Sequence, residues 1–319
     1  MIKAIAISGP TASGKTRLSL ELAERISAEI ISADSMQIYK GMDIGTAKAT
    51  PAERERVPHH LIDFLEPTES YSTERYRHDA LAAAEKITAR GKIPLFVGGT
   101  GLYIDTLLRA PQTQIPESSP EYRDKIMSEL RTDADVHALW QRLCEVDSES
   151  AEKIHENNVR RVIRALEIYE ATGMTKTELD ALSRKRTRDV EILVITLDFH
   201  SRDTLYSRID ARVDEMMREG LLEEVTALYE KGFLDGKNTA SQAIGYKELL
   251  SYIRGESTLS EALEILKQST RRYAKRQLTW FRHVDAKKIM LDGEDGKLRS
   301  FDEILGEALE IINAEFSPT

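Results

Sequence analysis

The stretch Gly9-Pro10-Thr11-Ala12-Ser13-Gly14-Lys15-Thr16 matches the phosphate-loop pattern G-x-x-x-x-G-K-[ST]. An apolar run at 2–8 precedes it and a helical pattern at 17–25 follows it, so the motif has its strand–loop–helix context. Glycines let backbone N–H groups wrap phosphate oxygens, and the helix N-terminus adds partial positive charge. The stretch therefore predicts a site for a phosphate or diphosphate group, but it does not indicate which molecule bears that group.

Two side chains of this loop carry chemistry of their own. Lys15 adds a full positive charge, and the Thr16 hydroxyl is the expected protein ligand of Mg²⁺. All eight residues of the loop are predicted to bind the phosphate groups. The alternative is a glycine-rich turn that binds nothing, which the intact spacing and flanks disfavour.

Composition describes an ordinary globular protein of 319 residues, with 41% hydrophobic and 31% charged residues. Its only cysteine, Cys144, excludes an intrachain disulfide and a cysteine metal cluster, and it fits a reducing, cytoplasmic setting. No stretch approaches the roughly 18 apolar residues of a membrane span. We expect a cytoplasmic monomer without a membrane partner.

A net charge of −9 argues against a nucleic-acid partner, but three basic segments qualify that reading. Residues 267–288 contain eight lysines and arginines against one acid, Asp285, and shorter basic blocks lie at 159–164 and 184–188. An acidic protein with concentrated basic segments can bind a polyanion locally. For each block, a solvated helix face is an equally good interpretation.

Strand and helix patterns alternate through the first hundred residues. Buried strands are predicted at 2–8, 29–34 and 92–97, and helices at 71–90, capped by Ser72, and at 100–109. Such alternation predicts an α/β fold: a parallel sheet of the phosphate-loop NTPase type, flanked by helices on both faces.

Prolines at 111, 116 and 120 mark a break, after which 121–188 shows helical periodicity until a further strand at 190–197. The chain therefore reads as a core interrupted by an all-helical insertion. The predicted parts are the first part of the core at 1–112, the insertion at 113–189, and at 190–319 the last core strand with mostly helical sequence after it.

Two further groups of residues follow predicted strands. Asp34 comes directly after the second strand, and in open α/β sheets ligands bind beyond the carboxyl ends of strands. A carboxylate there is suited to accept a proton from a nucleophile. Gly98-Gly99-Thr100 ends the third strand in the same way, although alone it also describes a tight turn. Asp198 ends the strand at 190–197, where a turn residue or a metal-side carboxylate of an NTPase would both fit.

Later segments add cationic and aromatic residues. Arg208 and Arg212 lie four apart on one helix face and are suited to neutralise a departing diphosphate. The alternative is an exposed ion-pair face with Asp210, Asp214 or Glu215. The segment 275–282 alternates basic residues with the aromatic Trp280 and Phe281, a composition that suits contacts to RNA. These two aromatic residues are more often part of a core.

Several segments together resemble the tRNA dimethylallyltransferases, in order from about residue 1 to 290. They are the loop at 9–16, Asp-Ser-Met-Gln-Ile-Tyr-Lys-Gly-Met-Asp-Ile-Gly-Thr-Ala-Lys at 34–48, Pro-His-His-Leu at 58–61, Val-Gly-Gly-Thr-Gly-Leu-Tyr at 97–103, Arg-Arg-Val-Ile-Arg-Ala-Leu-Glu at 160–167, Ala-Ile-Gly-Tyr at 243–246 and Ala-Lys-Arg-Gln-Leu-Thr-Trp-Phe-Arg at 274–282. The loop is generic, whereas 34–48 and 274–282 are specific. The zinc-finger tail of some eukaryotic relatives is absent, so the resemblance is to the bacterial form.

The resemblance implies transfer of a dimethylallyl group from dimethylallyl diphosphate to the exocyclic amine of the adenosine 3′ of the anticodon, position 37. The substrates would be tRNAs reading codons that begin with U, and the product isopentenyladenosine. Asp34 would be the general base that accepts the proton of the amine. Thr100 would hold the adenine or the diphosphate in place. Lys15, Thr16 with Mg²⁺, Arg208 and Arg212 would bind and stabilise the leaving diphosphate.

The resemblance also implies which residues contact the tRNA anticodon stem-loop, with the insertion as a gripping arm. They are Asp34, Ser35, Met36, Gln37, Thr100, Arg123, Asn158, Val159, Arg160, Arg161, Val162, Gln242, Gly245, Tyr246, Lys275 and Arg282.

Three other functions share parts of this pattern. A small-molecule kinase of the phosphate-loop type, which would bind ATP, would share the loop, Asp34 and the arginines, but it explains neither the helical insertion nor the basic C-terminal segment. A free-nucleotide prenyltransferase would have a similar core without the insertion. A nucleotide switch would need a base-specificity motif, which we do not find.

Overall fold

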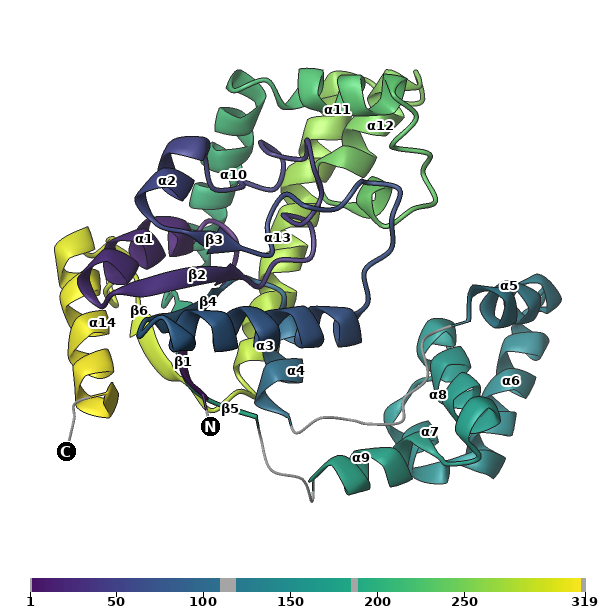
Figure 1. Ribbon diagram of the computed structural model, residues 1–319. Helices are drawn as coiled ribbons and strands as arrows, with labels where there is room; N and C mark the ends of the chain where they lie inside the picture. Colours follow the sequence, from purple (N-terminus) through teal and green to yellow (C-terminus); the bar gives the residue numbers. More distant parts are fainter. Residues whose placement is uncertain (1, 110–118, 185–188, 317–319) are drawn as a thin grey trace. The chain divides into compact units, whose positions relative to one another are not determined.

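The computed structural model describes residues 2–109, 119–184 and 189–316. The chain divides into two compact units (Figure 1), of which unit 1 comprises Met1–Leu108 and Val190–Thr319 and unit 2 comprises Arg109–Asp189. The predicted boundary at 112–113 and most of the basic block at 184–188 lie outside the described residues. None of the described helices combines the length and the apolar character that crossing a membrane requires.

Unit 1 is built on one six-stranded sheet in the order β3-β2-β4-β1-β5-β6, and every neighbouring pair is parallel. The strands are β1 (Ile2–Ser8), β2 (Ala28–Ser32), β3 (His59–His60), β4 (Ile93–Val97), β5 (Val190–Asp198) and β6 (Lys287–Met290). The predicted α/β class with a parallel sheet is confirmed.

The two edge strands were not predicted. β3 has two residues, and β6 reads Lys-Lys-Ile-Met, so neither forms an apolar run long enough to be recognised as a strand. Short, lysine-bearing strands are typical sheet edges, because they discourage further pairing. The prediction that the chain after Arg202 is mostly helical therefore missed β6, which pairs with β5.

Alternate side chains of β1 build the two faces of this sheet. Ile5 and Ile7 belong to a core that includes α1 (Lys15–Arg25), α10 (Arg202–Arg218) and α14 (Phe301–Phe316). Ala4 and Ala6 belong to a second core, with α3 (Thr73–Ala89) and α4 (Gly101–Leu108). Small alanines on the second face leave room for the stacked rings of Tyr76 and Tyr103.

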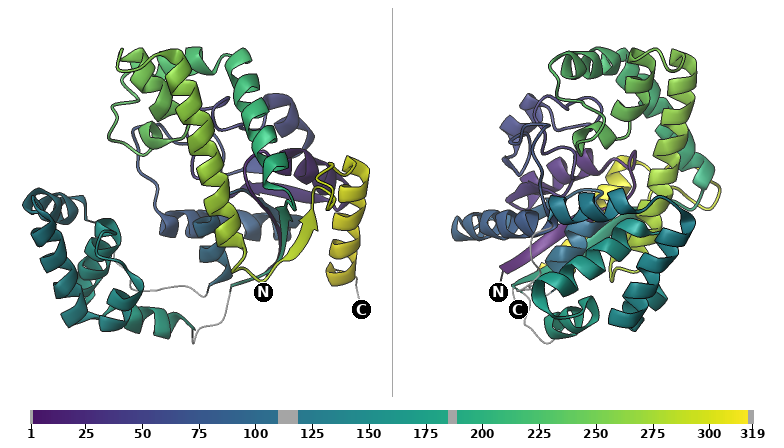
Figure 2. Two further views of the ribbon diagram at one scale, coloured as in Figure 1. Left: turned by 180° about the vertical axis from the view of Figure 1, so that it is seen from behind. Right: turned by 90° about the vertical axis from the view of Figure 1, so that its right-hand side faces the viewer.

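A third core holds the segment that follows β2. Ile38, Tyr39 and Met42 pack with α10, α11 (Leu221–Glu230), α12 (Tyr246–Ile253) and α13 (Leu259–Phe281). Figures 1 and 2 show α10 and α13 running alongside each other from the sheet to the α11–α12 pair. The remaining short elements are α2 (Pro51–Arg56) and a 3₁₀ turn at Ala240–Gln242.

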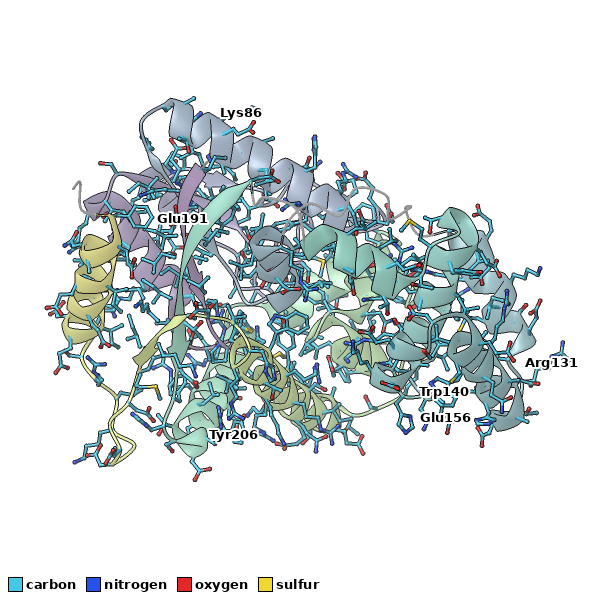
Figure 3. All side chains as sticks on the ribbon, turned by 90° about the horizontal axis from the view of Figure 1, so that it is seen from below. Lys86, Arg131, Trp140, Glu156, Glu191 and Tyr206 are labelled. Atoms are coloured by element: carbon cyan, nitrogen blue, oxygen red, sulfur yellow. The ribbon has the colours of Figure 1, made fainter. Side chains whose placement is uncertain are left out.

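The described part of unit 2 is helical. It contains α5 (Pro120–Glu129), α6 (Asp133–Val146), α7 (Ser148–Lys153), α8 (Val159–Thr172) and α9 (Lys176–Arg184). Its own core includes Leu143 and Val162, and Trp140 (labelled in Figure 3) donates from Nε1 to the carbonyl of Ile154 at 2.8 Å. The unit thus buries apolar side chains without needing the sheet.

Candidate active site

One cavity of about 560 Å³ lies at the carboxyl ends of β1, β2 and β4, where the sequence places its candidate residues. All of the residues that line it belong to unit 1. One wall is the phosphate loop and the start of α1. A second wall is the segment after β2, and side chains of α10 and α13 complete the lining, among them Arg212, Tyr273 and Gln277.

The phosphate loop has the backbone geometry that anion binding requires. Gly9 has φ +143°, and a Cβ there would lie 2.7 Å from the carbonyl oxygen of Leu197, so only glycine fits beside β5. Ala12 and Gly14 also have positive φ, of 62° and 83°. Helix α1 begins at Lys15 with no side chain capping its N-terminus, so its first N–H groups are open to a ligand anion.

Lys15 is held within the loop rather than by a carboxylate. Its Nζ donates to the carbonyl oxygens of Gly9, at 3.0 Å, and Pro10, at 2.6 Å. Burial and, to a smaller extent, the nearby Arg212 lower its pKa to about 7, while Asp34 acts in the opposite direction. A bound diphosphate would supply the negative charge that favours the ammonium form.

The two arginines of α10 take different positions. Arg208 donates from Nε to the carbonyl of Ala12 at 2.8 Å and so braces the loop. Arg212 lines the cavity, and its buried Nε has no hydrogen-bond partner among the described residues. Burial lowers the pKa of both guanidinium groups. A half-buried guanidinium next to the phosphate loop, with an unpartnered Nε, is suited to an anionic ligand.

The exposed ion-pair face that was the alternative for these arginines is formed by other residues. Asp210 pairs with Arg271, and Asp214 pairs with Lys267. These pairs link α10 to α13 and leave Arg208 and Arg212 on the side of the loop.

On the second wall, Asp34 lies at the cavity surface with its carboxylate oriented by its own loop. Its Oδ1 accepts from the backbone N–H groups of Met36, at 2.9 Å, and Gln37, at 3.4 Å. Thr100 supports this loop from β4, because its Oγ1 accepts from the N–H of Ser35 at 3.0 Å. Thr100 is thus placed to orient the cavity wall that carries Asp34.

The rest of the 34–48 segment is fixed by contacts from distant parts of the chain. Both carboxylate oxygens of Glu224 accept backbone N–H bonds from residues 43–45, at 2.8–3.1 Å, and Oε1 also accepts from the hydroxyl of Tyr246 at 2.6 Å. Gln37 donates to the carbonyls of Thr46 and Ala47. The whole segment therefore forms one braced wall.

Three of the residues expected to contact RNA are buried in this structure. Gly245 and Tyr246 are buried, and the Tyr246 ring packs where a Cβ on Gly45 would lie, so these residues support the wall. Val162 is 1% exposed and belongs to the core of unit 2. The exposed Arg161 and Lys247 lie next to Val162 and Tyr246, because helical segments place core and surface positions side by side.

Most of the other expected RNA contacts are accessible. Ser35, Met36 and Gln37 line the cavity, as does the exposed Gln242, whereas Thr100 lies behind Ser35. On α13, Lys275 and Arg282 are exposed. In unit 2, the exposed residues are Asn158, Arg160 and Arg161; Val159 is half-buried, and Arg123 is half-buried in an ion pair with Glu167.

Two sequence alternatives are resolved toward structural roles. Asp198 is not among the cavity-lining residues; its Oδ1 accepts from the next backbone N–H at 2.8 Å and lies 4.0 Å from Arg202. Phe281 is buried in the core with α3 and α4, and Trp280 packs against that core. Neither observation supports the ATP-using or base-stacking interpretation of these residues.

Sequence reasoning missed the contribution of α13 to the cavity. Thr270, Tyr273, Arg276 and Gln277 line it, together with Lys247 of α12. The only available signal was their spacing, since positions three, four and seven apart share one helix face. Among the described residues, no group of three or more His, Cys, Asp or Glu side chains is placed to hold a metal ion.

Comparison with known proteins agrees with this geometry. The family model described as IPP transferase matches residues 37–284, and the model described as Isopentenyl transferase matches residues 2–64. The chain belongs to the IPP transferase family. Curated relatives in this family include the tRNA dimethylallyltransferase of Anoxybacillus flavithermus, which is 50% identical over 282 residues, 88% of each chain.

Solved structures of the IPP transferase family share the fold. The tRNA isopentenylpyrophosphate transferase of Bacillus halodurans is 40% identical, with a TM-score of 0.70 covering 99% of this chain and 97% of that chain. A eukaryotic dimethylallyltransferase acting on tRNA is 32% identical, with a TM-score of 0.82 covering 99% of this chain and 79% of that one. Membership of this family does not favour the small-molecule kinase.

Proposed function

We propose that this chain transfers a dimethylallyl group from dimethylallyl diphosphate to the exocyclic amine of the adenosine 3′ of the anticodon in tRNA. The observation that carries the proposal is one cavity lined by both the phosphate loop with Arg212 and the carboxylate of Asp34. Family membership supports it, because relatives across the chain's length are named tRNA dimethylallyltransferases.

The two walls divide the chemistry between them. The amine lone pair attacks the allylic carbon, the bond from that carbon to the bridging oxygen breaks, and the electron pair leaves with diphosphate. Asp34 accepts the proton that the amine loses. Lys15, the loop N–H groups and Arg212 stabilise the negative charge that grows on the leaving group. The phosphate loop thus holds a leaving group rather than a phosphoryl donor.

Mg²⁺ is part of the proposal, with Thr16 as its protein ligand. The lack of a carboxylate cluster in the described chain fits this choice, because Mg²⁺ usually keeps several waters and binds through substrate phosphates with few protein groups. When bound, the ion would neutralise charge on the diphosphate. Thr16 lines the cavity beside Lys15, so its hydroxyl is available there.

The RNA contacts are proposed from accessible residues only. Met36 and Gln37 line the cavity beside Asp34, and the exposed Gln242, Lys275 and Arg282 extend this surface within unit 1. Thr100 acts behind it, through Ser35. In unit 2 the proposed contacts are the half-buried Arg123 and Val159 and the exposed Asn158, Arg160 and Arg161.

The remaining parts of the proposal concern substrate choice and setting. Preference for tRNAs that read codons beginning with U is proposed from the family resemblance. A monomer is proposed, and the cytoplasm is proposed as its setting because a single cysteine fits a reducing compartment.

A two-tube assay tests the function class. One tube holds the protein, Mg²⁺, anticodon stem-loop RNA and dimethylallyl diphosphate labelled in the allyl group; the other holds γ-labelled ATP in place of the diphosphate. We expect label on the RNA and none released from ATP. Phosphate released from ATP without label on RNA would assign the cavity to a kinase or a nucleotide switch.

A further inference from the structure

Gln277 of α13 connects two loops that come from different strands. Its Oε1 accepts the backbone N–H of Thr11 in the phosphate loop at 2.9 Å, and its Nε2 donates to the carbonyl of Gly99, after β4, at 2.9 Å. The side chain is 5% exposed. It also lines the cavity, so this connection lies beside the substrates.

The partners fix which end of the amide points where. A backbone N–H can only donate and a carbonyl can only accept, so exchanging oxygen and nitrogen would break both bonds at once. Glutamate would keep the acceptor for Thr11 but place a carboxylate oxygen against the carbonyl of Gly99. Leucine would leave both backbone groups unpaired. At this position only glutamine's length and its paired donor and acceptor serve both loops.

Gly99 is matched to this side chain. A Cβ on Gly99 would lie 2.2 Å from Nε2 of Gln277, closer than real Cβ contacts allow. Because the amide is buried and held at both ends, it cannot move aside without losing its bonds. Glycine at 99 is therefore required by the approach of Gln277.

The connection continues from Gly99 to the catalytic carboxylate. Thr100 follows Gly99 directly, and its hydroxyl accepts the N–H of Ser35, the neighbour of Asp34. We propose that Gln277 is a positioning residue that sets the phosphate loop at a fixed distance from the Asp34 wall, and so aligns the departing diphosphate with the attacking amine.

This proposal rests on the proposed function, because alignment matters only if donor and acceptor share the cavity. Displacing reacting groups by about 1 Å can lower a rate by about a hundredfold, so a displacement of a few tenths of an ångström already lowers the rate measurably. Helix α13 also exposes Lys275 and Arg282, so RNA affinity must be measured separately from alignment.

The test uses two substitutions that disrupt the hydrogen bonds of the Gln277 amide, one at Gln277 itself and one at Gly99. Gln277→Leu removes both bonds, and Gly99→Ala displaces the amide while leaving glutamine in place. Gln268→Leu is the matched control, since Gln268 is an exposed glutamine of α13 that does not line the cavity. Gln277→Glu keeps the side-chain size should the leucine variant fail to fold.

We expect each single variant to lower kcat per folded enzyme by roughly tenfold, the scale of a lost buried hydrogen bond. The double variant should fall no further than the worse single variant, because both changes break the same pair. The dissociation constant for stem-loop RNA should stay within about twofold, and Gln268→Leu should match wild type.

A merely structural role would lower the melting temperature and leave kcat unchanged, which would overturn the proposal. Effects that multiply in the double variant would overturn it as well.

Calorimetry with inorganic diphosphate and Mg²⁺ separates this inference from the function. If wild type transfers no prenyl group but binds inorganic diphosphate, the proposed function fails. Weaker binding in both Gln277→Leu and Gly99→Ala, with the control unchanged, would still support the positioning role. If both variants bind inorganic diphosphate as wild type does and keep its kcat, the positioning role of Gln277 is contradicted.

Discussion

The two walls of the cavity are built on different principles. The phosphate loop takes its binding groups from eight consecutive residues, which supply its glycines, its lysine and its hydroxyl, and Lys15 bonds to carbonyls of its own loop. Arg208 of α10 and Gln277 of α13 brace this loop from outside. The 34–48 wall is assembled from far away, by Glu224, Tyr246 and Thr100. The first wall binds by backbone geometry; the second depends on the packing of the whole unit.

This difference teaches where each wall is vulnerable. A change in Lys15 should affect the diphosphate alone, because the hydrogen bonds of its side chain stay within the phosphate loop. A change in the braces of the 34–48 wall should affect the acceptor side without touching the loop. Substitutions can therefore separate the walls, ordered below from the largest expected effect to the smallest.

Replacing Asp34 by asparagine should have the largest effect. The amide keeps the shape of the side chain but cannot accept the amine proton, so we expect turnover to fall by roughly 10²–10⁴-fold. Stem-loop binding and inorganic diphosphate binding should stay near wild type. Asp198→Asn, at a strand end outside the cavity lining, is the control. A near-normal rate for Asp34→Asn would remove it as the base.

Lys15→Ala should come next and act on the other wall. Loss of the ammonium should lower the rate by roughly 10²–10³-fold and weaken diphosphate binding, because one positioned donor is missing. RNA affinity should not change. Lys86→Ala on the exposed surface of α3 is the control, and calorimetry with inorganic diphosphate is the measurement. Equal diphosphate affinity in Lys15→Ala and wild type would contradict the assignment of this loop.

Glu224→Gln should separate the walls more gently. Four donors now bond to the two carboxylate oxygens of Glu224, whereas the neutral amide has only one acceptor oxygen. The 43–45 turn should therefore lose about 1–3 kcal/mol of stabilisation. We expect kcat/KM for RNA to fall while diphosphate affinity is kept, with the exposed Glu223→Gln as control. A drop in diphosphate affinity as large as the drop for RNA would mean that the walls are not independent.

The smallest effect concerns protons. Since the pKa of Lys15 is lowered to about 7, the free enzyme holds a mostly neutral Lys15 at pH 8 and a mostly charged one at pH 6. Diphosphate favours the charged form, so binding at pH 8 should take up more protons in wild type than in Lys15→Met; the difference should vanish at pH 6. Calorimetry in buffers of different ionisation enthalpy measures it. The same uptake in both proteins at pH 8 would show that Lys15 is charged before binding.

The same contrast explains what the sequence could predict. The loop, the central strands and the position of Asp34 follow from local patterns, and the structure places them together. The braces of the second wall join residues up to 181 positions apart, and no local pattern marks Glu224 or Gln277 as partners of 43–45 or Thr11. The burial of Tyr246 and Val162 could not be predicted, because residue type and motif do not show which face of a helix is buried. The edge strands β3 and β6 were too short to show a pattern.

The central claim is that the two walls act on one donor and one amine, and a single-turnover experiment tests it most directly. Released diphosphate and prenyl groups on RNA are counted together, with a stem-loop carrying adenosine at the target and with one carrying inosine, which lacks the exocyclic amine. We predict one diphosphate released per prenyl group with adenosine, and neither with inosine. Release of diphosphate at the same rate with inosine would contradict attack by that amine.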